Sequence, residues 1–210
     1  MPKTKTSPGP DIPEPLFVLA SASPRRRELL AATGLTFSIA PTDVDESVGP
    51  NESPEELVGR LSFLKAKAGS EISPSLPVIS ADTVVALGER VFGKPENLTE
   101  AKAMLQSLSG QVHRVITGVS VIWAERQREK SLLVTSRIAF RKLTEGEIDF
   151  YLSLNESLDK AGAYAIQMGG GFLVDYLEGS YTNVVGLPLK ETLAALAMVL
   201  GHDPLVKKPA

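Results

Sequence analysis

Hydrophobic and polar residues follow two different spacings along this chain, and these spacings predict its strands and helices. Runs that are rich in Val, Ile and Thr, or that alternate in polarity, predict strands over residues 16–20, 36–40, 78–86, 115–123, 131–140 and 172–176. Apolar residues three or four positions apart predict helices that follow Ser23, Ser53, Thr99 and Thr144, and a last helix that begins at Leu189. Each helix is expected to bury one apolar stripe, and residues 181–188 are expected to form a loop.

Cap and turn residues mark the ends of several of these elements. Residues 53–56 and 144–147 have the composition of a capping box, in which a hydroxyl and a glutamate satisfy the first backbone N–H groups of a helix. Gly88 with Glu89 predicts a tight turn after the strand 78–86. The charged segment 125–130 is expected to connect a second, longer β-hairpin.

Composition bounds the size and the class of the protein. With 210 residues, 43% of them hydrophobic, the chain is long enough for one domain with room for two lobes around a cleft. A net charge of −3 gives no global basic surface, so no nucleic acid polymer is expected as a partner. No apolar run is long enough to span a membrane. The absence of cysteine excludes disulfides and thiolate metal sites, and it fits a cytoplasmic enzyme.

The two histidines narrow the chemistry further. A histidine-rich metal centre is excluded and a Ser-His-Asp triad is disfavoured, and we expect His113 to be a hydrogen-bonded strand residue. A metal ion would depend on carboxylates, which favours Mg²⁺ or Mn²⁺. Residues 1–15 contain five prolines and lack the apolar segment of a signal peptide. We therefore expect a disordered tail, followed by a single domain over residues 16–210.

Residues 21–27 combine the features of an anion site. They follow the first strand, and Ser23 and Pro24 are expected to be the N-cap and the first residue of a helix. Helix N-termini expose N–H groups and partial positive charge, to which Arg25 and Arg26 add guanidinium groups. The alternative is a capped surface helix with solvated arginines, because charged runs are common on helix faces.

Asp82 lies inside the apolar strand 78–86. A buried carboxylate is costly unless it is paired, hydrogen-bonded or bound to a metal ion, so we expect Asp82 to have a partner and a function. The alternative is an aspartate that caps a turn at a strand end, but Thr83 and the valines after it continue the strand pattern.

Four further polar residues extend this set. Lys65 flanks the apolar stripe of the second helix, Lys94 is held between glycine and proline, and Glu46 lies in an acidic loop. Gln167 suits recognition of a base edge, because an amide both donates and accepts hydrogen bonds. Each of the four has a plain alternative as a solvated surface side chain. The two lysines and Glu46, together with the arginines and Asp82, predict a site for phosphate chemistry with direct attack by water.

Seven motifs, in this order along the chain, resemble those of the Maf family of nucleoside triphosphate pyrophosphatases. They are LASASPRR (19–26), VDE (44–46), KAKA (65–68), ADTVV (81–85), GKP (93–95), DKAGAYAIQ (159–167) and NVVGLPL (183–189). The resemblance implies an α/β fold of two lobes with a mixed sheet and a central cleft, similar to that of inosine triphosphate pyrophosphatases. It also implies hydrolysis of a nucleoside triphosphate to the monophosphate and pyrophosphate, a divalent metal ion (Mg²⁺ or Mn²⁺) and a possible homodimer.

The same resemblance implies a role for single residues. Asp82 would be the proton acceptor, and Glu46 with Asp82 would face the metal ion. The triphosphate would be held by Ser21, Arg26, Lys65 and Lys94.

Three positions separate the branches of the family. The branch that acts on dTTP and UTP has Arg, Thr and Gln there, and this chain has Arg25, Thr83 and Gln167. The resemblance thus implies a cytoplasmic dTTP/UTP pyrophosphatase that removes nucleotides from the pool. The alternatives are a pyrophosphatase for 7-methyl-GTP or for a broad range of nucleotides, and a nucleotide-binding regulator of cell division.

Overall fold

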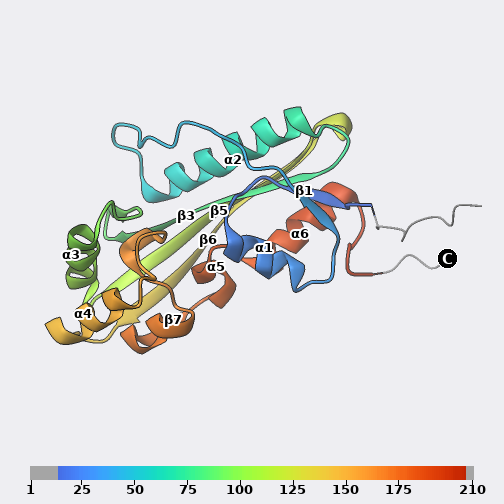
Figure 1. Cartoon of the computed structure of the whole chain (residues 1–210). Coiled ribbons are helices and arrows are strands. Elements are labelled where there is room, and N and C mark those ends of the chain that lie inside the picture. The colour runs from blue at the N-terminus through green and yellow to red at the C-terminus, as the bar shows by residue number, and fades with distance from the viewer. Residues whose placement is uncertain (1–13, 207–210) are drawn as a thin grey trace, which may run out of the picture.

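One mixed β-sheet forms the centre of the protein. A computed structural model describes residues 14–206, and in them seven strands pair in the order β2-β1-β3-β5-β6-β7, with β4 added to β3 (Figure 1). The strands are β1 (Phe17–Leu19), β2 (Phe37–Ile39), β3 (Val78–Leu87), β4 (Arg90–Phe92), β5 (Val112–Trp123), β6 (Arg128–Phe140) and β7 (Val174–Glu178). β1 is parallel to β2 and β3, and the remaining pairs are antiparallel. The expected α/β class with a mixed sheet is confirmed.

Helices cover both faces of this sheet. They are α1 (Pro24–Ala31), α2 (Pro54–Ile72), α3 (Leu98–Leu108), α4 (Glu145–Ser153), α5 (Tyr181–Val185) and α6 (Leu189–Leu200), with short 3-10 segments η1 (Ala124–Arg126), η2 (Ala161–Ala163) and η3 (Met168–Leu173). α2 lies along one face, α1, α5 and α6 lie on the other, and α3 and α4 lie at one end (Figure 1). None of the helices in the described part is long and apolar enough to cross a membrane.

Two large hydrophobic clusters lie at opposite ends of the sheet. One packs α3, α4 and η2 together, and its largest members include Phe92, Leu105 and Tyr151. The other packs α1 and α6 against β1, with Phe17, Leu30 and Leu196. β3 and β5 contribute to both clusters: Val85 and Val115 to the first, Ile79, Ala81, Val119 and Val121 to the second. The two lobes are therefore built on one continuous sheet.

One edge of β3 is only partly covered by neighbouring strands. β1 pairs with Val78 and Ile79, and β4 pairs with residues 85–87, whereas β5 pairs with residues 78–86 on the opposite edge. Within residues 14–206, no strand pairs with residues 80–84 on the first edge. β1 and β4 both end beside this gap, so the loops that follow them reach it from its two sides. The short length of β1 and β4 thus leaves part of β3 open to a ligand.

Most of the expected helix ends and turns are confirmed. The capping boxes at 53–56 and 144–147 are both formed, and α6 ends at Gly201 in a left-handed conformation. Gly88, with φ of 62°, forms the turn between β3 and β4. The long hairpin is also present, although its strands extend further than expected and leave only residues 124–127 between them.

Three expectations about local structure are wrong, and they concern an N-cap, a short helix and the start of a strand. The N-cap of α3 is Asn97 and not Thr99, because the Asn97 side chain accepts a hydrogen bond from the N–H of Glu100. Residues 181–188 are not all loop, since α5 begins after Ser180, whose side chain caps it. β7 starts two residues later than expected, because residues 168–173 form η3. Residues 1–13 of the expected tail lie outside the described residues.

Candidate active site

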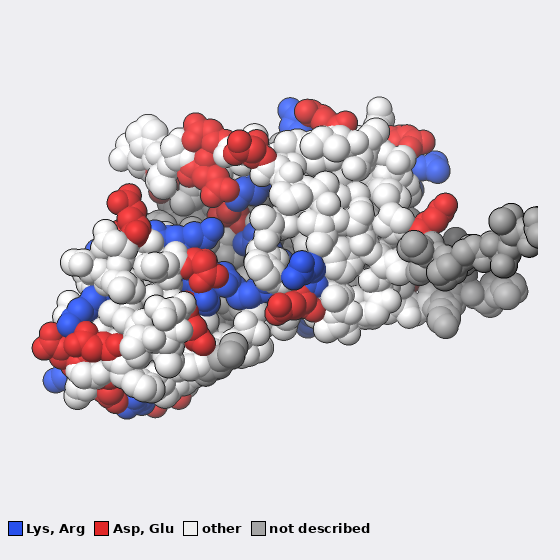
Figure 2. Space-filling view, in the orientation of Figure 1, with Lys and Arg blue, Asp and Glu red and all other residues white. Residues whose placement is uncertain are grey.

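The gap beside β3 opens into a cavity of about 710 Å³. This volume is within the range of small-molecule binding sites. Figure 2 shows lysine and arginine side chains gathered along a hollow in this face, with acidic side chains at its rim. All nine residues singled out from the sequence line the cavity: Ser21, Arg25, Arg26, Glu46, Lys65, Asp82, Thr83, Lys94 and Gln167. The fold therefore brings together residues that are up to 146 positions apart (167 − 21).

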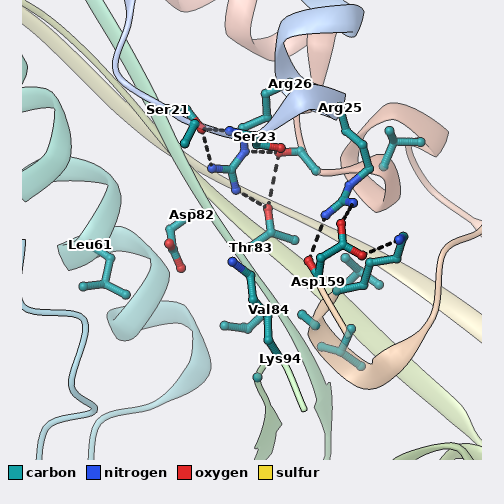
Figure 3. Close-up of a pocket in the computed structure, with 18 of the residues that line it drawn as sticks. Ser21, Ser23, Arg25, Arg26, Leu61, Asp82, Thr83, Val84, Lys94 and Asp159 are labelled. Carbon is teal, nitrogen blue, oxygen red and sulfur yellow. Dashed lines mark hydrogen bonds and ion pairs between the residues drawn. The ribbon is translucent and has the colours of Figure 1, made fainter. Parts of the chain in front are cut away.

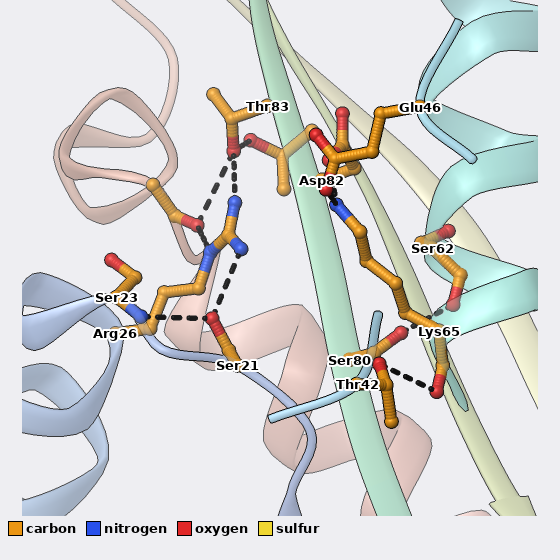
Figure 4. A network of polar contacts seen from close by, with 12 residues as sticks. Ser21, Ser23, Arg26, Thr42, Glu46, Ser62, Lys65, Ser80, Asp82 and Thr83 are labelled. Atoms are coloured by element: carbon orange, nitrogen blue, oxygen red, sulfur yellow. Dashed lines mark hydrogen bonds and ion pairs between the residues drawn. The ribbon is translucent and has the colours of Figure 1, made fainter. Parts of the chain in front are cut away.

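Asp82 and Thr83 reach this cavity from opposite faces of the sheet. Successive side chains of a strand point to opposite faces, so Asp82 points toward α2 and Thr83 toward α1 and α5 (Figure 4). Because the edge of β3 is open at this point, the cavity extends past it and both side chains border it. A pairing strand here would have separated them into two different environments.

Lys65 is the partner of the buried carboxylate. Its ammonium lies 2.6 Å from Asp82 Oδ1 and 2.7 Å from Glu46 Oε1. The side chains of Lys65 and Asp82 are 11% and 13% exposed, while that of Glu46 is 62% exposed. The expectation that Asp82 needs a partner is confirmed, and the sequence did not indicate which residue it would be.

The position of Lys65 depends on how closely α2 packs on the sheet. Gly118 of β5 lies directly under the backbone carbonyl of Val58, and a Cβ at this position would overlap that carbonyl. Ser62 extends the contact, because its hydroxyl hydrogen-bonds that of Ser120, and its backbone carbonyl accepts from Ser80. The absence of a side chain at Gly118 thus lets Lys65 reach the edge of β3.

The side chains of Ser21 and Arg26 are hydrogen-bonded to each other at the start of α1. Ser23 and Pro24 take the expected N-cap and first helical positions, but the Ser23 side chain forms no capping bond in the described structure. The Ser21 hydroxyl instead accepts from the Ser23 N–H at 3.2 Å and from Arg26 Nη1 at 3.3 Å (Figure 3). The start of α1 therefore faces the cavity through Ser21 and Arg26.

Arg26 is held entirely by neutral acceptors. Nε donates to the Gly186 carbonyl at 2.9 Å, and Nη2 donates to the Thr83 hydroxyl at 3.2 Å. No carboxylate forms an ion pair with it in residues 14–206. Burial lowers the pKa of the Arg26 guanidinium, partly opposed by the charge of Asp82, but arginine stays charged at neutral pH. This half-buried cation has no carboxylate partner in the described residues, so it is suited to bind an anion.

Arg25, the neighbouring arginine, is engaged differently. Its Nη1 donates to Asp159 Oδ2 at 2.8 Å and its Nη2 to the Asp159 carbonyl at 3.3 Å. Burial opposes ionisation of Asp159, but hydrogen bonds from Lys160 and Arg25 outweigh it and lower the pKa of this carboxyl. The contact joins α1 to the loop before η2 across the cavity (Figure 3).

Lys94 and Gln167 border the cavity from the other lobe. Lys94 follows β4, and the flanking Gly93 carbonyl accepts a hydrogen bond from the N–H of Gly162 at 3.0 Å. Pro95, on its other side, is buried, so the backbone on both sides of the exposed Lys94 is fixed. Gln167 precedes η3 and lines the cavity beside Ile166. The roles assigned to these residues by resemblance stay predictions.

The two acidic residues fit a single cation. Oxygens of Glu46 and Asp82 converge on one ammonium nitrogen, which marks a position where one positive ion contacts both carboxylates. No group of three or more His, Cys, Asp or Glu residues suited to a metal ion occurs in the described part of the chain. Mg²⁺ commonly uses one or two carboxylates together with water and substrate phosphates, so this donor set suits it.

Three residues that sequence reasoning did not place in the site support it. Asp159 holds Arg25, the Gly186 carbonyl holds Arg26, and the fully buried Thr117 shares a hydrogen bond of 2.9 Å with the hydroxyl of Thr83. Asp159 and Gly186 lie inside the motifs DKAGAYAIQ and NVVGLPL, which was an available signal. Thr117 has no such signal, because it is one more β-branched residue in a strand.

The fold and the cavity define an α/β protein whose cleft brings two carboxylates and several cations together at an open strand edge. The family model described as "Maf-like protein" matches residues 16–199. A protein of Myxococcus xanthus named dTTP/UTP pyrophosphatase is 51% identical over 181 residues, covering 86% of this chain and 91% of that protein. Proteins with the same name from Syntrophus aciditrophicus and Bacillus cereus are 45% and 42% identical, covering 86% of this chain and 88% and 93% of theirs. This chain belongs to the Maf family.

Proposed function

We propose that this protein is a dTTP/UTP pyrophosphatase, which hydrolyses these nucleotides to the monophosphate and pyrophosphate within the cytoplasmic pool. One observation carries the proposal: a carboxylate, Asp82, borders the same cavity as two cations, Arg26 and Lys94, that no carboxylate neutralises in the described residues. The name shared by relatives that are 42–51% identical supports the choice of substrate.

The cations account for binding of the triphosphate. Arg26 is held by Gly186, Ser21 and Thr83 before any ligand arrives, so little conformational entropy is lost when it contacts a phosphate. Lys94 adds a second charge from the opposite lobe. Such groups stabilise the negative charge that redistributes over the phosphate oxygens in the transition state.

Asp82 accounts for activation of the attacking water. Its Oδ1 accepts a hydrogen bond from Lys65, and in the described residues its Oδ2 forms none, so Oδ2 can accept a proton from water. Glu46 and Asp82 would hold the divalent metal ion, which would supply further positive charge for the triphosphate. Arg25, Thr83 and Gln167 line the same cavity, and we expect them to contact the base or sugar and to favour the pyrimidine branch.

The test is release of pyrophosphate by wild type and by Asp82→Asn, with UTP and either Mg²⁺ or Mn²⁺. A general base contributes about 10²–10⁴-fold, so the variant should lose at least about 100-fold in kcat. Asp175→Asn is the matched control, because Asp175 is exposed on β7 and lies outside the cavity lining. Undiminished release by the Asp82 variant would remove this residue from the mechanism.

A substrate panel separates the proposal from its alternatives. Comparison of kcat/KM for dTTP, UTP, CTP and 7-methyl-GTP distinguishes the pyrimidine branch from the 7-methyl-GTP branch and from broad specificity. Tight nucleotide binding without turnover of any of them would favour a regulator of cell division. The homodimer stays a prediction, for which the mass in solution is the direct measurement.

A further inference from the structure

Lys65 occupies the position between the two carboxylates that a metal ion would use. One ammonium nitrogen contacts both carboxylates (Figure 4), and it lies 2.7 Å from Glu46 Oε1 and 2.6 Å from Asp82 Oδ1. A metal ion that contacts both oxygens would lie at almost the same point as this nitrogen, and two cations in contact repel strongly. A metal ion and the Lys65 ammonium therefore cannot contact the Glu46 and Asp82 oxygens at the same time.

The surroundings make this competition strong. The Lys65 and Asp82 side chains are mostly buried, so their attraction is screened less than that of an exposed ion pair. Removing the lysine would leave a mostly buried carboxylate without a positive partner, which is unfavourable until another cation arrives.

We propose that Lys65 is an internal counter-ion of the metal site and must leave the carboxylates before a divalent metal binds there. The proposal rests on the proposed function for the identity of the metal site. The protein without nucleotide therefore binds metal weakly. A triphosphate offers the displaced ammonium new oxygen partners, so metal and nucleotide bind cooperatively.

Lys94 provides a matched control for charge. It lines the same cavity, and it forms no ion pair with a carboxylate in residues 14–206. Lys65→Met and Lys94→Met therefore lower the charge of the cavity by the same amount, but only the first empties the position between the carboxylates.

The experiment measures Mn²⁺ binding to the whole protein without nucleotide, by electron paramagnetic resonance of the unbound ion. We expect Lys65→Met to bind Mn²⁺ about tenfold or more tightly than wild type, within the usual range of coupling between two ligands. Lys94→Met should change the affinity by less than about threefold, and Lys65→Arg, which keeps a cation, should stay as weak as wild type. Equal tightening by both methionine variants, or none by Lys65→Met, overturns the proposal.

A second measurement needs no variant. In the wild-type protein, Mn²⁺ should raise the rate at which an amine-reactive acylating reagent modifies Lys65, because the ammonium is released from its two partners. The rate at Lys94, read by mass spectrometry from the same sample at constant ionic strength, should not rise. An unchanged Lys65 rate at saturating Mn²⁺ contradicts the proposal.

These outcomes are independent of hydrolysis. If the protein releases no pyrophosphate from any triphosphate, the proposed function fails while Mn²⁺ tightening by Lys65→Met still supports the counter-ion. If pyrophosphate release is normal and Lys65→Met has no effect on Mn²⁺ binding, the proposed function stands and the counter-ion proposal is refuted.

Discussion

The stability of this protein should depend on pH through one buried histidine, His113. Its Nε2 forms a hydrogen bond of 2.8 Å with the hydroxyl of Tyr164, and its Nδ1 has no partner in the described residues. The ring is 1% exposed and meets Phe140 edge-on, with the ring centroids 4.8 Å apart. A protonated imidazole needs two acceptors, so burial here disfavours the charged form.

Burial lowers the pKa of His113 from 6.5 to about 4. The unfolded chain therefore binds a proton more readily than the folded protein between these values. The stabilising contribution is complete above the unfolded pKa, and it is lost as the pH falls from about 6.5 to about 4. Linkage gives a loss of about 1.2 kcal/mol at about pH 5.5 and about 2.4 kcal/mol at about pH 4.5, relative to about pH 7.

The assay is urea unfolding of wild type and of His113→Gln across this range. Glutamine can retain a hydrogen bond to Tyr164, and it does not titrate. The free energy of unfolding of wild type should fall more steeply toward acid, so that the difference between the two proteins changes by about 2–3 kcal/mol between pH 7 and pH 4.5. Curves that stay parallel over this range would show that His113 is not buried as a neutral ring, and the reasoning would be wrong.

Two further predictions concern packing and capping. Gly118→Ala should lower the free energy of unfolding in urea by about 2 kcal/mol and should also lower pyrophosphate release, because α2 must move away from the sheet and carries Lys65 with it. Gly59→Ala is the control: its added Cβ meets only an ordinary contact at 3.7 Å, so it should leave the free energy of unfolding unchanged or raise it. Asn97→Ala should lower the free energy of unfolding by about 1 kcal/mol, and Thr99→Ala by less than about 0.5 kcal/mol; the reverse order would show that the cap is misassigned.

Most elements could be predicted because their signals are local. The capping box at 53–56 satisfies its own helix, and the turn at Gly88 needs only a residue that adopts positive φ. The choice between Asn97 and Thr99 was not predictable in the same way. Both residue types can cap a helix, and only the structure shows that the Asn97 side chain accepts the hydrogen bond from the Glu100 N–H.

The short helix α5 could not be predicted for a different reason. Its five residues are too few to show helical periodicity, and its stability comes from tertiary contacts. The side chain of Asn183 donates to the Val115 carbonyl and to the Ser136 hydroxyl, both at 3.0 Å. Those partners are at least 47 positions away in the sequence, so no local pattern reports them.

The nine residues singled out from the sequence line the candidate site, but the geometry of the site was not predicted. The apolar run around Asp82 showed that this carboxylate must have a partner, and burial beside Lys65 agrees. The gap at the edge of β3 was not predictable, since it depends on β1 and β4 each being only three residues long. The contact of Arg25 with Asp159 likewise depends on how two lobes meet, and this is a property of the whole fold.

The long strands shared by the two lobes have a consequence for how a ligand is accommodated. β5 and β6 run for 12 and 13 residues and pair with each other along nearly their full length. A hinge needs a few backbone positions that absorb a large rotation, and a hydrogen-bonded ladder of this length offers none. To bend the sheet between the lobes, several backbone hydrogen bonds between β5 and β6 would have to break at once. We therefore expect the cleft to keep a nearly constant width, so that a base is selected by its fit to walls already in place and not by closure around it.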